Sequence, residues 1–197
     1  MSHSEDTDFV RLVSLACHDL RTPLATVHGF ARTLARIDGL DPTALRFVHM
    51  IDAASVQLAD LLDQLSDAAR IEGRRFDPSL RRTSTLELAR GAADRLGADT
   101  VFVTGDGGEV ETEPETATRA VFNLARGALR HGGLERIDLR ADGRVLALSP
   151  VPPEVAPILL GSELKDLGSA IACRTIAALG GSVEHQGETL VVRLPSG

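Results

Sequence analysis

Apolar residues recur every three to four positions along the first third of the chain, which is the spacing of an amphipathic helix. Residues 8–37 carry this pattern, and Gly29 is their one glycine. The apolar positions are Phe9, Leu12, Ala16, Leu20, Leu24, Val27, Ala31 and Leu34. The segment 38–42 interrupts the pattern, and we expect Asp41 to cap a second helix that has Pro42 in its first turn.

A second stretch with the same spacing follows and ends near Gly73. The positions of this pattern are Leu45, Val48, Ile51, Ala54 or Ser55, Leu58, Leu61 or Leu62, Leu65 and Ala68. Two long helices joined by a short loop predict an antiparallel hairpin. A single hairpin cannot cover both apolar stripes, so we expect two copies to pair as a homodimer with a four-helix bundle.

The pattern changes after the second helix. Residues 74–82, RRFDPSLRR, are charged and contain Pro78, which indicates a linker or domain boundary. The sequence therefore predicts a helical-hairpin dimerisation domain over residues 1–76 and a second domain over residues 77–197.

The second domain mixes helix and strand patterns. We expect helices over residues 85–96, 114–130 and 166–179, and strands over 100–104, 135–141, 143–148, 182–184 and 190–194. Asp142-Gly143 and Gln186-Gly187 lie between strand patterns and predict hairpin turns. The predicted fold class is α+β: the helical hairpin is followed by a small α/β sandwich in which helices cover one face of a mixed sheet.

Composition excludes several classes of function. The net charge is −7, and the chain has no Trp or Tyr, so neutralisation of phosphates and stacking of bases are poorly supported and we expect no nucleic-acid partner. The sequence contains no run of 18 apolar residues, so we expect no membrane span. The N-terminus is polar, so we expect no secretory signal and a cytoplasmic location. Cys17 and Cys173 are isolated in the sequence and are typical of small buried residues.

One short stretch of the first helix carries candidate chemistry: HDLRTPL, residues 18–24. The His18 imidazole is a nucleophile near neutral pH and can carry a phosphoryl group on one ring nitrogen. Asp19 can accept a proton or hold the tautomer in which the other nitrogen attacks. Thr22 lies one turn along the same face, where its hydroxyl can reach a water or a phosphate oxygen. Pro23 removes one helix hydrogen bond and permits a bend.

This heptapeptide, with VHGFARTL downstream, resembles the phosphoacceptor box of sensor histidine kinases. The resemblance implies that His18 is the phosphorylation site and that Asp19 assists autophosphorylation. It also implies that Thr22 serves dephosphorylation of a response regulator, whose receiver domain would be the partner.

The rest of the chain resembles the ATP-binding domain of the same family in a degenerate form. Residues 115–132 resemble the helix that carries two asparagines, but only Asn123 is present, and Gly127 stands at the magnesium-binding position. Where the family has a strand that ends in an adenine-reading Asp before Gly-x-Gly, residues 146–154 contain neither Asp nor Gly.

The phosphate-binding and lid segments also depart from the family. In the second glycine-rich box, residues 164–171, only Gly168 remains, and Asp166 stands where backbone should meet phosphate. The lid is reduced to residues 156–165. Because nucleotide phosphates need both magnesium and close backbone N–H groups, we expect no nucleotide cofactor and no metal.

The remaining candidates favour structural roles. His28 and His49 lie on the two hairpin helices without the spacing of a metal site, and His131 lies at a helix end, where a cation suits the helix dipole. The acidic residues at positions 109, 111, 113 and 115 predict a solvated face.

Three functions are compatible with these features. The preferred one is a histidine phosphotransferase that relays a phosphoryl group between response regulators through His18 without ATP. The alternatives are a non-catalytic adaptor or phosphatase that docks a response regulator, and a divergent ATP-dependent sensor histidine kinase. The intact acceptor box beside a damaged nucleotide site favours the first.

Overall fold

The computed structural model describes residues 2–97 and 99–195, with side chains from Phe9 onward. It consists of two compact units, of which the first ends at Arg75 and the second begins at Phe76. Among the described residues, no helix has the length and apolar character needed to cross a membrane.

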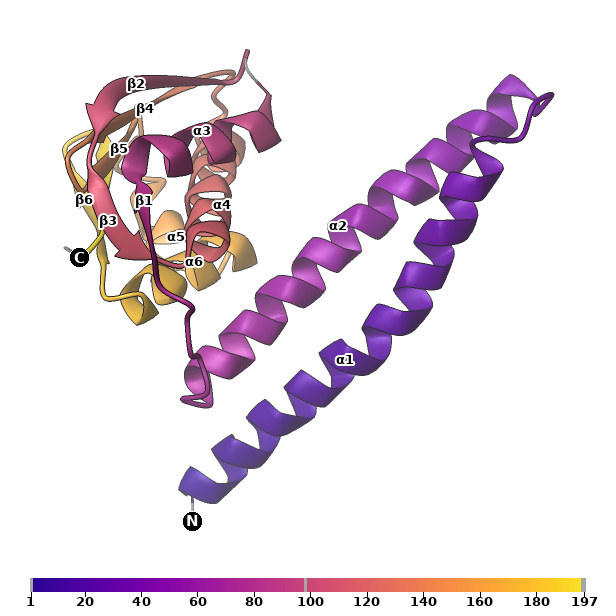
Figure 1. The fold of residues 1–197 in the computed structure, drawn as a ribbon, viewed down its shortest axis with the longest axis horizontal. Helices are drawn as coiled ribbons and strands as arrows, with labels where there is room; N and C mark the ends of the chain where they lie inside the picture. Colours follow the sequence, from indigo (N-terminus) through magenta and orange to yellow (C-terminus); the bar gives the residue numbers. More distant parts are fainter. Residues whose placement is uncertain (1, 98, 196–197) are drawn as a thin grey trace. The chain divides into compact units, whose positions relative to one another are not determined.

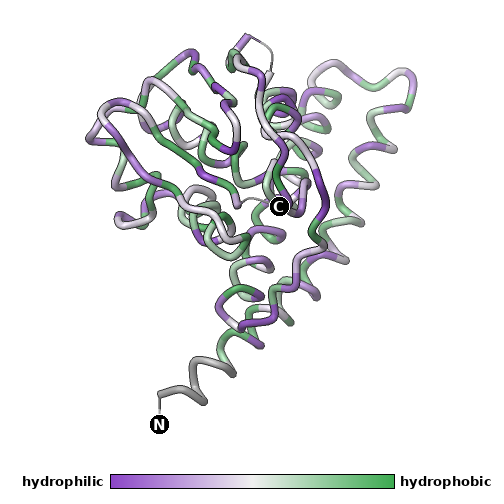
Figure 2. The backbone as a smooth tube through the Cα atoms, turned by 60° about the vertical axis from the view of Figure 1, so that its left-hand side comes forward, coloured by the Kyte–Doolittle hydropathy of each residue, from purple (hydrophilic) through white to green (hydrophobic). Residues whose placement is uncertain are grey.

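The first unit is an antiparallel pair of helices, α1 (Ser2–Leu34) and α2 (Pro42–Glu72) (Figure 1). Pro23 lies inside α1, and the helix continues through it. Hydrophobic and hydrophilic residues are interspersed along both helices (Figure 2). The buried positions include Cys17 and Ala31 of α1 and Val48 and Ala69 of α2, all of them small or medium-sized, so the two helix backbones can approach closely.

The start of α2 differs in one detail from the sequence expectation. Asp41 occupies the N-cap position and Pro42 lies in the first turn, but the Asp41 side chain accepts no capping hydrogen bond. Asp41 is thus the N-cap residue, as expected, but it caps the helix without a side-chain hydrogen bond. The Asp41 carbonyl instead accepts the first intrahelical hydrogen bond, from the Leu45 N–H at 2.9 Å.

The second unit is built on a five-stranded mixed sheet with the strand order β2-β4-β5-β7-β6. Its strands are β2 (Val101–Gly107), β4 (Ile137–Asp142), β5 (Val145–Ser149), β6 (Ser182–Gln186) and β7 (Thr189–Arg193). Strands β2 and β4 pair in parallel, and the other neighbours pair antiparallel. Both predicted hairpin turns are present, and Gly143 and Gly187 have the positive φ angles that such turns require.

Helices cover one face of this sheet (Figure 1). They are α3 (Thr85–Leu96), α4 (Pro114–Gly132) and α6 (Leu167–Ala178), with a single turn α5 (Ala156–Leu159) in the segment expected to be a shortened lid. The core between helices and sheet holds fully buried aliphatic side chains such as Leu88, Leu124, Leu139 and Leu148. Burial of each contributes about 1.5–3 kcal/mol. The predicted helical hairpin followed by an α/β sandwich is confirmed.

A second, two-stranded sheet was not expected. Strand β1 (Arg81–Ser84) pairs antiparallel with β3 (Glu109–Thr112). Two residues of the predicted linker, Arg81 and Arg82, therefore belong to a strand, and the expectation of a linker that extends to residue 82 is wrong. In β3 the side chains of Glu109 and Glu111 are exposed whereas those of Val110 and Thr112 are buried, so this part of the acidic string reflects the two-residue period of a half-buried strand.

Candidate functional site

His18 lies on an open surface of α1. Its side chain is 77% exposed and that of Asp19 is 67% exposed, and Nδ1 of His18 lies 3.1 Å from Oδ1 of Asp19. In the tautomer with the proton on Nδ1, the Nδ1–H group donates a hydrogen bond to this carboxylate, and the lone pair of Nε2 is free. In that tautomer, a ring nitrogen with a free lone pair belongs to a side chain that is open to solvent.

A shallow surface hollow adjoins this imidazole. The residues that line it are His18, Arg21, Thr22, Ala25 and Thr26. The Thr26 hydroxyl donates a hydrogen bond to the Thr22 carbonyl at 3.2 Å. The structure thus brings two of the predicted residues, His18 and Thr22, to one hollow, with Asp19 bonded to the histidine ring.

Arg21 is a member of this hollow that the sequence reasoning missed. Its Nη2 donates a hydrogen bond to Oδ1 of Asp63 on α2 at 2.8 Å, and the two side chains are 51% and 45% exposed. The available signal was the three-residue spacing from His18, which places both side chains on neighbouring parts of the helix surface.

An apolar stripe lies on the other side of α1. Phe9, Leu20, Val27 and Leu34 are between 42% and 66% exposed. At about 100° per residue, these four positions lie about 160–200° around the helix from His18. The exposed side chains of Leu12 and Phe30 lie about 120° from His18, and that of Leu15 about 60°, so the exposed apolar surface also extends toward the histidine. Helix α2 exposes further apolar side chains, among them those of Phe47, Ile51 and Leu58. The hairpin of a single chain therefore has a solvent-exposed histidine and a solvent-exposed apolar surface.

The structure also describes the side chains of two further histidines of the hairpin, His28 and His49. Nδ1 of His28 on α1 lies 2.9 Å from Oδ1 of Asp52 on α2, whereas His49 is exposed. Across the described ranges, no group of three or more His, Cys, Asp or Glu residues is placed to hold a metal ion. Cys17 is buried, and desolvation raises the pKa of its thiol, which opposes its use as a nucleophile.

In the second unit, small residues bring α4 and α6 into close contact. A Cβ atom on Gly127 would overlap Oγ of Ser169 and would lie 2.8 Å from Cδ2 of Leu159. Near Gly168, the Asn123 side chain is 97% buried, and its Oδ1 has no hydrogen-bond partner among the described residues. The space beside Gly127 is therefore occupied by side chains of the chain itself.

Asp166 has a structural role at the start of α6. Its Oδ1 accepts a hydrogen bond from the Ser169 backbone N–H at 2.7 Å, and its Oδ2 lies 3.2 Å from Nε2 of His131. Burial acts to raise the pKa of Asp166, but the hydrogen bonds from Ser169 and His131 outweigh it and hold the pKa below its usual range. The carboxylate caps the helix and ties it to α4 through His131.

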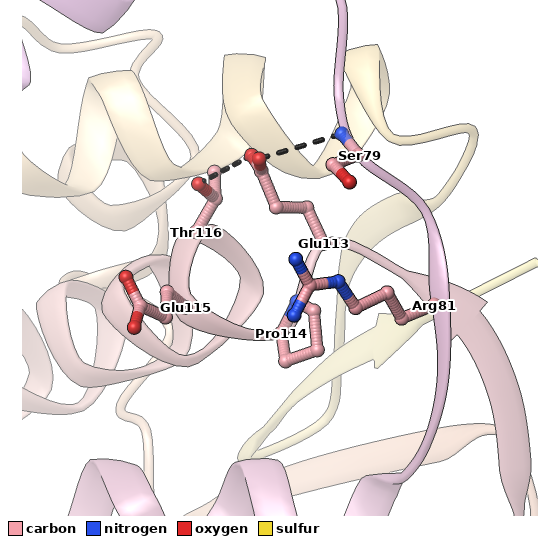
Figure 3. Close-up of a pocket in the computed structure, with 6 residues that line it drawn as sticks. All are labelled: Ser79, Arg81, Glu113, Pro114, Glu115 and Thr116. Atoms are coloured by element: carbon pink, nitrogen blue, oxygen red, sulfur yellow. Dashed lines mark hydrogen bonds between the residues drawn. The ribbon is translucent and has the colours of Figure 1, made fainter.

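A second hollow lies where β3 leads into α4 (Figure 3). It is lined by Ser79, Arg81, Glu113, Pro114, Glu115 and Thr116. The Glu113 carboxylate accepts hydrogen bonds from the Thr116 hydroxyl at 2.7 Å and the Ser79 N–H at 3.4 Å. Glu113 was expected on a solvated face, but it is half-buried and fastens the segment before β1 to the start of α4.

Comparison with known proteins gives a match for the hairpin. Residues 10–74 match the model of the His Kinase A (phospho-acceptor) domain. The chain is 30% identical over 131 residues to sensor protein DivL of Caulobacter vibrioides, a match that covers 62% of this chain and 17% of that protein. It is 31% identical over 165 residues to sensor protein kinase PmrB of Pseudomonas aeruginosa, which covers 74% of this chain and 33% of that protein. The chain thus spans a third or less of these relatives.

Solved structures share the architecture of both units. The crystal structure of full-length ShkA in complex with AMPPNP is similar to this chain, with a TM-score of 0.65 and 20% identity. The match covers 95% of this chain and 47% of the ShkA chain. The Acinetobacter baumannii histidine kinase AdeS matches 90% of this chain and 96% of its own, with a TM-score of 0.57 and 18% identity. At these identities the likeness concerns the fold: a helical hairpin followed by an α/β sandwich.

Proposed function

Because the domain match and the relatives support the membership of this chain in the histidine kinase family of two-component systems, we propose that it acts as a histidine phosphotransferase. In this function His18 relays a phosphoryl group between aspartates of response-regulator receiver domains, and ATP is not used. The observation that carries the proposal is the exposed His18 imidazole, which has Nδ1 against Asp19 and the hollow beside it.

The chemistry follows from this geometry. Nε2 of His18 attacks the phosphorus of an aspartyl phosphate, an N–P bond forms, and the P–O bond to the aspartate breaks so that a carboxylate leaves. The proton on Nδ1 stays in place, and Asp19 stabilises the positive charge that develops on the ring. Transfer to a second receiver domain is the reverse reaction. The Thr22 hydroxyl, one turn away, is placed to position water for dephosphorylation of a regulator.

Three features of the second unit support a relay that does not use ATP. Gly127 has no side chain for a metal ligand, and Ser169 and Leu159 take up the space beside it. The Asp166 carboxylate is committed to the Ser169 N–H and to His131. A magnesium–nucleotide complex needs a ligand set and room for phosphates, and these residues do not fit it. The proposal therefore includes a degenerate nucleotide-binding unit, with no cofactor.

A divergent ATP-dependent sensor histidine kinase is the second candidate function. The observation that favours it is Asn123, the remaining asparagine of the expected pair, whose buried Oδ1 has no partner among the described residues. The third candidate is a non-catalytic adaptor or a phosphatase. It would bind a response regulator on the hairpin surface, and His18 would not be stably phosphorylated.

Two labelled donors separate these functions. We expect the purified chain to take label from receiver domains phosphorylated with labelled acetyl phosphate and to take none from γ-labelled ATP with magnesium. Label from ATP would support the kinase instead, and release of free phosphate from the receiver without a protein adduct would support the phosphatase. Calorimetry should give an ATP dissociation constant weaker than about 100 μM, or about 5.5 kcal/mol; a tighter constant would contradict the proposed loss of nucleotide binding.

We further propose that the chain acts as a homodimer through the hairpin, because a second copy would cover its exposed apolar side chains. Leu58 is 52% exposed on α2, and burial of this exposed half in an interface would contribute about 1 kcal/mol. We expect Leu58→Glu to weaken the dimer at least tenfold, because it places a charge in that interface, whereas Gln57→Glu, at the exposed neighbouring position, should leave it unchanged.

Light scattering over a dilution series measures this effect. The wild-type chain at micromolar concentration should have a mass of about twice 20.9 kDa. A wild-type mass of one chain, or equal dissociation of the two variants, would show that Leu58 does not lie in a dimer interface.

A further inference from the structure

Arg21 lies between the acceptor histidine and the second helix. It follows His18 by three residues on α1, and both side chains line the same hollow. Its Nη2 donates to Oδ1 of Asp63 at 2.8 Å, a bond that crosses from α1 to α2. The guanidinium is therefore held at the rim of the hollow instead of extending freely into water.

The bond between Arg21 and Asp63 contributes little to the stability of the hairpin. Both side chains are about half exposed, and ion pairs of this kind contribute about 0–1 kcal/mol. Water and salt screen such a pair, and the helices already pack through their buried side chains. A structural role alone leaves unexplained why a planar, permanently charged donor lies in the hollow beside the nucleophile.

The chemistry of the proposed function supplies a role. A phosphoryl group on Nε2 of His18 brings about two negative charges into a hollow where Asp19 already contacts His18 and Asp63 contacts Arg21. Guanidinium groups bind phosphate oxygens through paired N–H donors, and these charge-assisted hydrogen bonds are stronger than neutral ones. The recorded bond to Asp63 uses Nη2, and the guanidinium carries five N–H donors.

We propose that Arg21 binds the phosphoryl group as it is transferred to and from His18, and that Asp63 is a positioning residue that orients the guanidinium. This inference rests on the proposed function and adds two residues to it. It also assigns a task to the second helix of the hairpin: Asp63 of α2 sets the direction of a group that acts on the nucleophile of α1.

Phosphorylation of the full chain by phosphoramidate tests the inference without a protein partner. Nε2 attacks the phosphorus, the P–N bond of phosphoramidate breaks, and its already protonated nitrogen leaves as ammonia. We expect Arg21→Gln to slow the formation of the His18 adduct about tenfold. Arg21→Lys, which keeps the charge, should remain within about threefold of the wild type. The matched control is Arg32→Gln, which removes an exposed arginine farther along α1 and should not change the rate.

Asp63 is tested through its coupling to Arg21. Asp63→Asn should slow adduct formation about threefold in the wild-type background and have no further effect in the Arg21→Gln background. A residue with only a structural role would not show this dependence. The circular dichroism of all variants should match that of the wild type, which separates a loss of transfer from a loss of fold.

The outcomes distinguish this inference from the function on which it rests. An adduct that is lost in His18→Gln but forms equally fast in Arg21→Gln and Arg32→Gln would overturn the role of Arg21 and leave the phosphotransferase standing. Additive effects of the Arg21 and Asp63 substitutions would overturn the positioning role. If the wild type forms no adduct that depends on His18, both the phosphotransferase and this inference are wrong.

Discussion

His18→Ala should abolish phosphoryl acceptance from a phosphorylated receiver domain and leave the helical hairpin intact. The imidazole is the nucleophile of the proposed reaction, and alanine supplies no replacement for Nε2. Because the side chain is 77% exposed, its removal opens no cavity, and alanine favours a helix. The measurement is the amount of acid-labile, base-stable label on the chain after incubation with the labelled receiver domain, with helix content followed by circular dichroism.

Two neighbouring substitutions serve as controls for this result. Asp19→Asn keeps the shape of the side chain but removes the charge beside Nδ1, so transfer should become slower without stopping. Thr22→Ala should leave acceptance by His18 unchanged and reduce any hydrolysis of the receiver phosphate. If His18→Ala accepts as much label as the wild type, His18 is not the acceptor, and the adaptor function becomes the better explanation.

Gly127→Asn should destabilise the second unit by about 3 kcal/mol, although it introduces the residue type that the family resemblance would place there. The new Cβ would overlap Oγ of Ser169 and crowd Leu159, and overpacking of a tight core costs about 1–3 kcal/mol or more. Ser169 and Leu159 are both fully buried, so neither can move aside into solvent. The free energy of unfolding in urea measures the effect.

Gly133→Asn is the matched control for this substitution. Gly133 ends α4 in the left-handed conformation with open space around its Cβ position, and asparagine tolerates that conformation better than most residues. We expect a loss of about 1 kcal/mol there, at the low end of the range for a residue other than glycine in this conformation. If Gly127→Asn is as stable as Gly133→Asn and also binds magnesium–ATP, the close contact between α4 and α6 does not exclude the nucleotide.

The fold could be predicted from the sequence where local signals agree with packing. The apolar period, Pro42 and Gly73 bound α2 because each acts within a few residues. Helix α3 was predicted over its observed range, and a capping box of Ser84 and Glu87 fixes its start. Strands β1 and β3 were missed because each has four residues. Their pairing joins segments far apart in the chain, and their charged side chains resemble those of a linker.

The candidate site divides in the same way. His18, Asp19 and Thr22 are close in sequence and share one helix, so their proximity followed from helical geometry. Asp63 is 42 residues from Arg21, and the charges along α2 offered several partners of the same sign. An Asp just before a helical pattern is a local signal for an N-cap, but the bond between Asp166 and His131 joins residues 35 apart, so this partner could not be found from the local sequence.

The position of the apolar stripe on α1 has a consequence for the valency of the assembly. Phe9, Leu20, Val27 and Leu34 lie about half a turn around the helix from His18. A dimer that buries this stripe leaves the histidine of each copy on an outer surface, away from the stripe. Under the proposed function, we then expect each chain to engage one receiver domain, and a phosphoryl group on one copy to place no charge in the dimer interface. For the proposed relay we therefore expect a stoichiometry of two regulators to two chains.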